Sequence, residues 1–358
     1  MKGVLHDRHI ALGGVMGWAF GGLYPSRYLR GVASEHNATL YRVGILDVSF
    51  MGLIEFKGPG AEPLLEYLST NLISNSPNFS SIYTIWSNDW GGCIDDLTIL
   101  RFDTHHFLAI VNGPNLLNDL EHAQRVGRFF NVDIRDRSRD LAVCAIQGPD
   151  ACRVIEQIVG DLSGLKPFHI CERPFKDSTL YLHRTCYGGP NGIEVIVPLS
   201  HLAELWDILM EAGEQYAIEA VGLDARNILR LEAGFARYGH ELTPEIAATE
   251  SVASWTVKWM KGDFIGKEAL ARLENDPKKR SQRGFLIKSD FLVRSGSPIY
   301  IKDRWIGSVT TSDFSQCLQK PIALGMVNVP LAIGEQIEIE SRNRRVRAEV
   351  SPLPFFRL

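Results

Sequence analysis

Two adjacent carboxylates, Asp95 and Asp96, are the residues of this sequence whose setting most suggests chemistry. They follow the pair Gly91-Gly92 in the stretch YTIWSNDWGGCIDDLT and precede a short apolar run. Glycines permit the positive φ angles of a tight connection, and bounded apolar runs of this length are typical of buried strands. The pattern predicts a hairpin tip with a carboxylate at the mouth of a strand, where it could act as a general acid or base. Because adjacent side chains of a strand point to opposite faces, we expect only one of the two carboxylates to face a ligand. Aspartate after glycine is also ordinary turn chemistry, so this stretch alone leaves both interpretations open.

Three other polar residues fall where a strand ends or a helix begins. Asn112 closes an apolar run at 107–112, Glu194 lies inside the run 193–197, and Arg226 comes early in a helical pattern at 222–233. Polar side chains at such places can converge on a ligand. Each also has a structural interpretation, as a turn residue, an exposed strand position or a helix surface charge. A carboxylate such as Glu194 must either face solvent or be buried with a partner.

Composition indicates an ordinary globular protein. The 358 residues are 45% hydrophobic and 22% charged, which suits two or three domains with a sizeable core. The net charge of −4, with both signs interspersed, argues against a nucleic-acid partner. Residues 1–18 lack the apolar core of a signal peptide, and no run approaches the roughly 18 apolar residues of a membrane span. We therefore expect a cytoplasmic protein that does not associate with membranes.

The sequence offers no metal or nucleotide motif. Its six cysteines are far apart and form no C-x-x-C pair, and the adjacent His105 and His106 would point to opposite faces of a strand. There is no G-x-G-x-x-G, no G-x-x-x-x-G-K-[ST], no H-E-x-x-H and no G-x-S-x-G. We expect no bound metal.

Hydrophobic periodicity predicts alternating strands and helices, followed by a region of strands only. Helices are expected at 32–44, 60–68, 116–128, 148–159, 202–212 and 222–233, and strands at 45–49, 53–56, 107–112, 141–147 and 193–197. A strand, a Gly-Pro pair and a helix occur twice, in FKGPGAEPLLEYL and IQGPDACRVIEQI, which suggests two related α+β units. After a basic stretch at 277–282, short strands at 284–287, 298–301 and 305–310 predict a separate all-β unit.

Together these motifs resemble the aminomethyltransferase (T-protein) family of the glycine cleavage system. The matching motifs occur in the family's order and include Asp47-Val48-Ser49-x-Met51-Gly52, Gly91-Gly92-x-x-Asp95-Asp96, Gln147-Gly148-Pro149, Gly192-x-Glu194, Tyr238-Gly239, Trp255-Thr256 and Asp263-Phe264-Ile265-Gly266-Lys267-Glu268. The resemblance implies an α+β protein of three domains in a cloverleaf around a central folate cavity. The expected boundaries are 1–50 with 138–250 for a discontinuous first α+β domain, 51–137 for the second, 251–276 for a connecting segment, and 277–358 for a C-terminal β-barrel.

The resemblance implies a one-carbon transferase that uses tetrahydrofolate as co-substrate. It would move an aminomethyl-derived methylene group, or a methyl group, from a donor to N5 of tetrahydrofolate. Motif by motif, Asp96 would be the catalytic carboxylate and Glu194 would hold the pterin. The remaining folate-binding positions would be Arg226, Asn112, Tyr83, Tyr238, Trp255, Met51 and Arg283. A carboxylate can accept the adjacent N–H donors of a pterin in bidentate fashion, and arginine suits the glutamate tail.

Two departures from the family pattern concern the donor. The usual Asp-Val-Ser-His-Met carries Phe50 in place of histidine, and the usual Gly-Tyr-Thr-Gly-Glu-Asp-Gly is CYGGPNG at 186–192. The partner is therefore either a lipoyl-carrier protein or a small methylated or aminomethylated molecule. A folate-dependent demethylase and a non-enzymatic folate-binding assembly factor are the alternatives, although the cysteine signature of such factors is absent at 263–268. We expect a monomer or a weak homodimer.

Overall fold

The computed structural model describes residues 2–185 and 191–356, and the chain divides into two compact units. The first unit comprises Met1–Glu66, Leu72–Thr84 and Leu97–Asn227. The second comprises Tyr67–Asn71, Ile85–Asp96 and Ile228–Leu358. Each unit is therefore assembled from segments that are distant in sequence.

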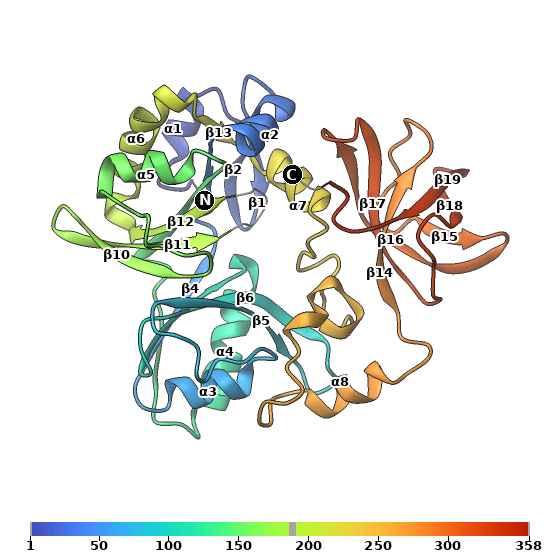
Figure 1. Ribbon diagram of the computed structural model, residues 1–358, viewed down its shortest axis with the longest axis horizontal. Helices are drawn as coiled ribbons and strands as arrows, with labels where there is room; N and C mark the ends of the chain where they lie inside the picture. Colours follow the sequence, from blue (N-terminus) through green and yellow to red (C-terminus); the bar gives the residue numbers. More distant parts are fainter. Residues whose placement is uncertain (1, 186–190, 357–358) are drawn as a thin grey trace. The chain divides into compact units, whose positions relative to one another are not determined.

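A six-stranded sheet forms one half of the first unit (Figure 1). Its strands, in spatial order, are β10 (Ile170–Phe175), β11 (Ser178–Thr185), β12 (Gly192–Pro198), β9 (Leu141–Gln147), β3 (Gly44–Asp47) and β13 (Glu219–Val221). The neighbouring strands are antiparallel except for β3 and β13, which are parallel. The elements before β3 are α1 (His6–Ala11), the hairpin β1 (Val15–Ala19) and β2 (Gly22–Arg27), and α2 (Val32–Tyr41).

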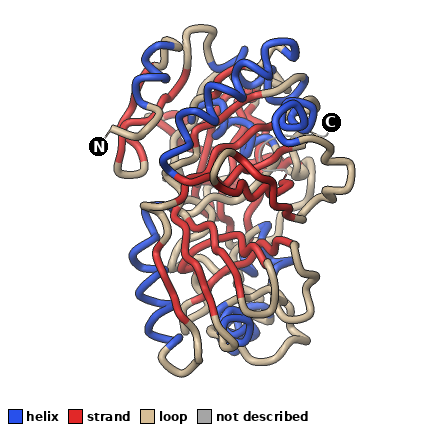
Figure 2. Tube along the Cα trace, turned by 90° about the vertical axis from the view of Figure 1, so that its left-hand side faces the viewer, coloured by secondary structure: helices blue, strands red, loops and turns tan. Residues whose placement is uncertain are grey.

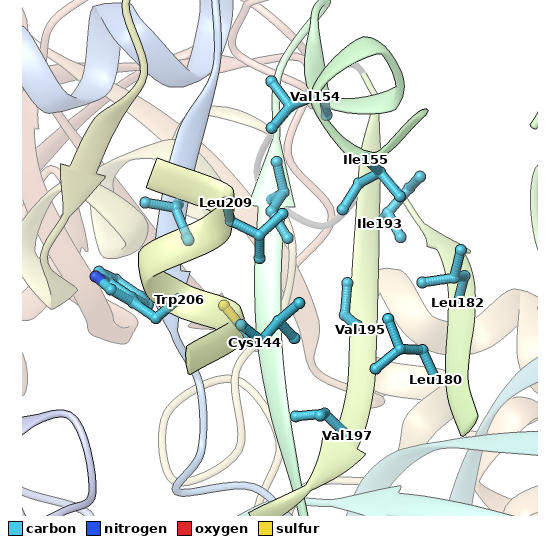
Figure 3. Close-up of a cluster of buried hydrophobic side chains, with 14 of the residues drawn as sticks. Cys144, Val154, Ile155, Leu180, Leu182, Ile193, Val195, Val197, Trp206 and Leu209 are labelled. Atoms are coloured by element: carbon cyan, nitrogen blue, oxygen red, sulfur yellow. The ribbon is translucent and has the colours of Figure 1, made fainter. Parts of the chain in front are cut away.

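Helices α5 (Ala151–Val159) and α6 (Leu202–Gly213) pack against each other and against this sheet. The short helix η2 (Leu199–His201) directly precedes α6, and η3 (Glu214–Tyr216) directly follows it. Figure 3 shows the resulting core, in which Val154 and Trp206 of the helices meet Cys144, Ile193 and Val195 of the strands. All five side chains are at most 1% exposed. The alternating buried positions of the strands thus create the surface on which the amphipathic helices pack.

A five-stranded sheet follows the order β5-β6-β7-β4-β8. Its strands are β5 (Ser80–Ser87), β6 (Cys93–Arg101), β7 (His106–Val111), β4 (Gly52–Lys57) and β8 (Asp133–Asp136), with helices α3 (Ala61–Leu68) and α4 (Leu116–Gly127) and the short η1 (Gly113–Asn115). Figure 2 shows helices in blue running beside strands in red. A second core cluster within the first unit joins this sheet to the six-stranded one, with Leu100 and Ile110 from the former and Ala145 and Ile196 from the latter.

The predicted strand, Gly-Pro and helix arrangement is present at both expected places. Gly58, between β4 and α3, has φ 124°, and Gly148, between β9 and α5, has φ 129°. In each case the N–H of the first helical residue, Ala61 or Ala151, donates to the glycine carbonyl at 3.0 Å. The predicted helix at 32–44 ends earlier, at Tyr41, because Gly44 begins β3 instead of capping the helix.

The second unit contains a closed six-stranded barrel in the order β14-β17-β16-β15-β18-β19, as predicted for the C-terminal region. The strands are β14 (Ser281–Ile287), β15 (Pro298–Ile301), β16 (Arg304–Ser315), β17 (Lys320–Val327), β18 (Gln336–Ser341) and β19 (Arg344–Ser351). Before the barrel come α7 (Leu223–Glu232), which crosses the unit boundary, η4 (Ala248–Glu250), η5 (Val252–Thr256) and α8 (Lys267–Glu274). Among all described residues, no helix has both the length and the apolar character to cross a membrane.

Candidate active site

Glu194 is partly buried and has a buried partner. It lies on β12 directly opposite His183 of β11, and the carboxylate oxygen Oε2 is 2.9 Å from Nδ1 of the imidazole. The side chain of His183 is 3% exposed, whereas that of Glu194 is 20% exposed. The sequence left open whether Glu194 faces solvent or is buried with a partner. The structure shows that its carboxylate is paired with His183 and still partly exposed to solvent.

Ser81 of β5 contacts the other side of this imidazole, since its Oγ is 2.8 Å from Nε2 of His183. The backbone holds this strand in place, because Ser81 N–H donates to the carbonyl of Phe168 and Ile170 N–H donates to that of Phe79, each at 2.8 Å. Tyr83 lies two residues after Ser81 and therefore on the same face of β5. The predicted site residues Tyr83 of β5 and Glu194 of β12 thus lie on two strands that His183 of β11 links through its two side-chain contacts.

Three other predicted residues gather around Phe50, in the turn between β3 and β4. Met51 N–H donates to the Val48 carbonyl at 3.0 Å, which closes this turn. Asn112 is the residue before η1, and its neighbour Gly113 lies so close to Phe50 that a Cβ there would be 1.8 Å from the Phe50 carbonyl oxygen. The guanidinium carbon of Arg226 is 5.8 Å from the centre of the Phe50 ring, within cation–π range.

The Phe50 ring is itself tightly packed. It stacks on Phe20 with ring centres 4.0 Å apart and meets Tyr24 edge-on at 5.3 Å. Phe50 and Ile196 belong to the same core cluster, and Ile196 shares its strand face with Glu194. The group around Phe50 and the carboxylate of Glu194 therefore border one apolar core within the first unit.

A buried chain of hydrogen bonds fixes the start of the same turn. Asp47 accepts from Ser49 N–H at 2.9 Å and lies 2.9 Å from Nε2 of His9, whose Nδ1 is 2.8 Å from the Tyr28 hydroxyl. Burial, with the nearby carboxylates of Asp47 and Glu35, raises the pKa of Tyr28 well above its usual range. Tyr28 therefore stays protonated and donates to His9 Nδ1, which leaves the Nε2 proton of His9 to bond Asp47.

Asp96 lies in the second unit, on the strand that leaves the predicted hairpin tip. Gly91 in the tip has φ 86°, and Asn88 Oδ1 accepts from the N–H groups of Trp90 and Gly92 at 3.0 and 2.9 Å. Asp95 is fully buried, whereas Asp96 is partly exposed. The alternation expected for two adjacent carboxylates on a strand is therefore present, and Asp96 is the more accessible one.

The segment 243–247 of the second unit supports this tip. Cys93 N–H donates to the carbonyls of Thr243 and Ile246 at 2.9 and 3.1 Å. A Cβ on Gly92 would lie 1.8 Å from the Pro244 carbonyl oxygen, so only glycine fits there. The backbone that leads to Asp96 is thus fixed by direct contact with the chain that follows Leu242.

Tyr238 lies in the loop just before that segment. The N–H of Gly239, with φ 81°, donates to the Leu242 carbonyl at 2.8 Å. The loop is anchored by an ion pair between Arg230 of α7 and Glu241, 2.9 Å apart, whose side chains are 1% and 0% exposed. A buried ion pair thus determines where the Tyr238 segment lies.

Trp255 and Arg283 complete the predicted set. Trp255 is on η5, 56% exposed, with the Lys258 ammonium 5.7 Å from its ring centre. Arg283 is partly buried on β14. The two elements are joined by a bond from Val252 N–H to the Gln282 side chain at 3.1 Å.

Sequence reasoning missed His183 and Ser81. His183 is a single histidine in a strand pattern, and its partner is 102 residues away in sequence, so no local motif signals the contact. The motif departure at 186–190 lies outside the described residues.

Comparison with protein families identifies both parts of the fold. Residues 5–261 match the GCVT N-terminal domain, and residues 280–357 match the glycine cleavage T-protein C-terminal barrel domain. The α+β portion and the barrel together define a protein of the GCVT class.

Individual relatives agree over nearly the full length. The chain is 34% identical to the aminomethyltransferase of Prosthecochloris aestuarii, with 94% of each chain covered, and 35% identical to that of Caldanaerobacter subterraneus subsp. tengcongensis, with 95% of this chain and 91% of the relative covered. The crystal structure of the glycine cleavage system aminomethyltransferase T from Bartonella henselae matches with a TM-score of 0.91 and 28% identity, covering 98% of this chain and 97% of that one. The chain belongs to the glycine cleavage T-protein family and is a transferase, as the resemblance predicted.

Proposed function

We propose that this enzyme transfers a one-carbon unit from an aminomethyl donor to tetrahydrofolate, and that Glu194 holds the pterin. Membership of the T-protein family supports the reaction class. The observation that carries the binding role is the partly exposed carboxylate of Glu194, held from behind by a buried histidine. Such a carboxylate fits the paired N–H donors of a pterin edge.

The residues around Phe50 would bind the rest of the ligand. Arg226 offers a guanidinium held over an aromatic ring, Asn112 offers an amide at the start of η1, and Met51 offers a flexible apolar surface. Tyr83, Tyr238 and Trp255 would supply aromatic contacts, and Arg283 would pair with the glutamate tail. The family resemblance and the exposure of part of each of these side chains support these roles.

Asp96 would manage the proton during transfer. When tetrahydrofolate is bound, its N5 accepts the one-carbon unit as the donor's amine or thiol leaves. A partly exposed carboxylate on a backbone as constrained as that of Asp96 can hold a proton or stabilise positive charge at one fixed place.

We further propose that the donor is an aminomethyl group on a lipoyl-carrier protein, because the relatives and the matched structure are aminomethyltransferases, the latter of the glycine cleavage system. Phe50, where the family usually has histidine, packs in a core and contacts Arg226. This change therefore alters the support of Arg226 and does not by itself require a different donor.

The test combines folate binding with a panel of donors. Glu194→Gln should weaken tetrahydrofolate binding by roughly tenfold or more, because glutamine retains one acceptor oxygen and loses the charge. Glu172→Gln, which removes an exposed carboxylate from β10 of the same sheet, is the matched control and should bind as the wild type does. Calorimetric titration under anaerobic conditions measures both.

Wild-type enzyme is then incubated with tetrahydrofolate and an aminomethylated lipoyl carrier, methylated amines or thioethers. Methylene-tetrahydrofolate from the lipoyl carrier alone supports the proposal, and methyl-tetrahydrofolate from a small donor identifies a demethylase instead. Binding without turnover of any donor would indicate a folate-binding factor. Equal affinities of the Glu194 variant and its control would contradict the pterin role.

A further inference from the structure

We infer that His183 is a positioning residue for Glu194, which it fixes in the orientation that accepts the paired N–H donors of a pterin edge. The inference deepens the function proposed above and rests on it. Ser81 is the third member of the arrangement, so that the order of contacts is Ser81, His183, Glu194.

The contacts place His183 as a fixed support. Its imidazole is bonded at both ring nitrogens, at 2.8 Å to Ser81 Oγ and at 2.9 Å to Glu194 Oε2. Its backbone is paired on both sides, with Ile170 of β10 and Glu194 of β12. A side chain that is bonded at two points between two paired strands has little rotational freedom left, so it transmits that order to Glu194.

The direction of each hydrogen bond follows from the groups involved. A carboxylate oxygen accepts, so Nδ1 of His183 carries the proton that is donated to Glu194. In the neutral imidazole Nε2 then accepts from the hydroxyl of Ser81. Within the described chain Oε1 of Glu194 accepts no hydrogen bond, so this oxygen and the second lone pair of Oε2 can receive two donors from a ligand.

A serine, a histidine and a carboxylate in this order also occur in hydrolytic enzymes, but the geometry here favours the positioning role. In a hydrolase the carboxylate is the buried member and backbone N–H groups near the serine stabilise the oxyanion. Here the Ser81 N–H is occupied by the Phe168 carbonyl, and the carboxylate of Glu194 is more exposed than the imidazole.

Two substitutions of His183 separate its two contacts. The amide nitrogen of asparagine occupies nearly the place of Nδ1, so His183→Asn can still donate to Glu194. The amide of glutamine reaches the place of Nε2, so His183→Gln retains the contact with Ser81 and loses the one with Glu194. We expect His183→Asn to bind tetrahydrofolate within about threefold of wild type and His183→Gln to bind it about tenfold more weakly.

If His183 acts only by packing, or only through its contact with Ser81, the two variants should show a different order of folate affinities. Equal losses in the two variants, an affinity closer to wild type for His183→Gln, or no loss in either would overturn the inference. Thermal unfolding checks that both variants fold. If either His183 variant does not fold, Ser81→Ala replaces it, because this variant retains His183 and its bond to Glu194 but removes the bond at Nε2. We expect Ser81→Ala to weaken binding about two- to fivefold, and wild-type affinity would count against the inference.

A double-substitution cycle with Glu194→Gln shows whether the effect passes through Glu194. His183→Gln, or Ser81→Ala, should cause no further loss in the Glu194→Gln background, because there is no carboxylate left to position. Additive losses would contradict the inference. If wild-type enzyme binds no reduced folate, the proposed function itself fails, and this result is distinct from a cycle that is additive. Covalent labelling of Ser81 by a fluorophosphonate probe would indicate a hydrolytic site instead.

Discussion

The buried ion pair between Arg230 and Glu241 allows a quantitative test of what holds the Tyr238 loop. Glu241 accepts from the hydroxyls of Thr310 and Thr311 at 2.5 and 2.7 Å as well as from Arg230 at 2.9 Å. Arg230→Leu would leave this carboxylate buried without its countercharge. Breaking a buried pair in this way costs about 3–5 kcal/mol of unfolding free energy, whereas an exposed pair contributes about 0–1 kcal/mol.

Urea unfolding followed by tryptophan fluorescence measures the loss for Arg230→Leu. The control is Arg272→Leu, which removes the cation of an exposed pair with Glu268 on α8 and should shift the free energy by less than about 1 kcal/mol. Replacing Arg230 and Glu241 together by leucine should recover at least part of the loss, because no unpaired charge is then buried. A cost for Arg230→Leu no larger than that of the control, or losses that simply add in the double variant, would refute the reasoning.

Two further predictions concern single carboxylates. Asp96→Asn should lower turnover by about a hundredfold or more, with little change in folate affinity, as measured by steady-state kinetics and calorimetry. The control is Asp89→Asn, which changes an exposed carboxylate at the same tip and should leave turnover and affinity unchanged. Parallel losses of turnover and affinity in Asp96→Asn would contradict a role in chemistry. Glu55 is buried, which by itself raises its pKa, but hydrogen bonds from Lys57, Arg137 and His106 lower the pKa from 4.5 to about 2. Because the folded-state value is the lower one, Glu55 stabilises the fold above about pH 4.5 and this contribution disappears as the pH falls towards 2. Wild type should therefore have a larger free energy of unfolding than Glu55→Gln at neutral pH, and urea titrations should show this difference shrinking as the pH falls from about 4.5 towards 2. A difference that stays constant with pH would contradict the lowered pKa of Glu55.

The features that were predicted correctly have local causes. The Gly-Pro pairs before α3 and α5 signal a strand-to-helix turn through the residues themselves, and the structure has that turn at Gly58 and Gly148. The alternation of Asp95 and Asp96 follows from strand geometry alone. The family and the C-terminal barrel were recognised because their motifs occur in order along the chain.

The features that were missed depend on contacts distant in sequence. The hairpin of β1 and β2 contains glycine and proline and lacks a clean apolar alternation, so periodicity gives no strand signal there. The predicted helix at 32–44 is too long because a glycine suits both a helix end and a strand start, and pairing of Gly44 with Gln147 decides between them. His183 and Ser81 acquire their roles only when β5 and β11 meet.

The path of the chain through the two compact units has a consequence for dissecting the enzyme. The chain passes from one unit to the other after residues 66, 71, 84, 96 and 227, so neither unit corresponds to one uninterrupted piece of gene. A fragment that starts at Ile228 would lack the Ser69 and Asn71 carbonyls that accept from the buried Lys261 ammonium, each at 2.7 Å. Truncated chains would therefore lack part of a unit and fold incompletely. Recombination between homologous genes should preserve function only where the crossover leaves these returning segments with their own unit.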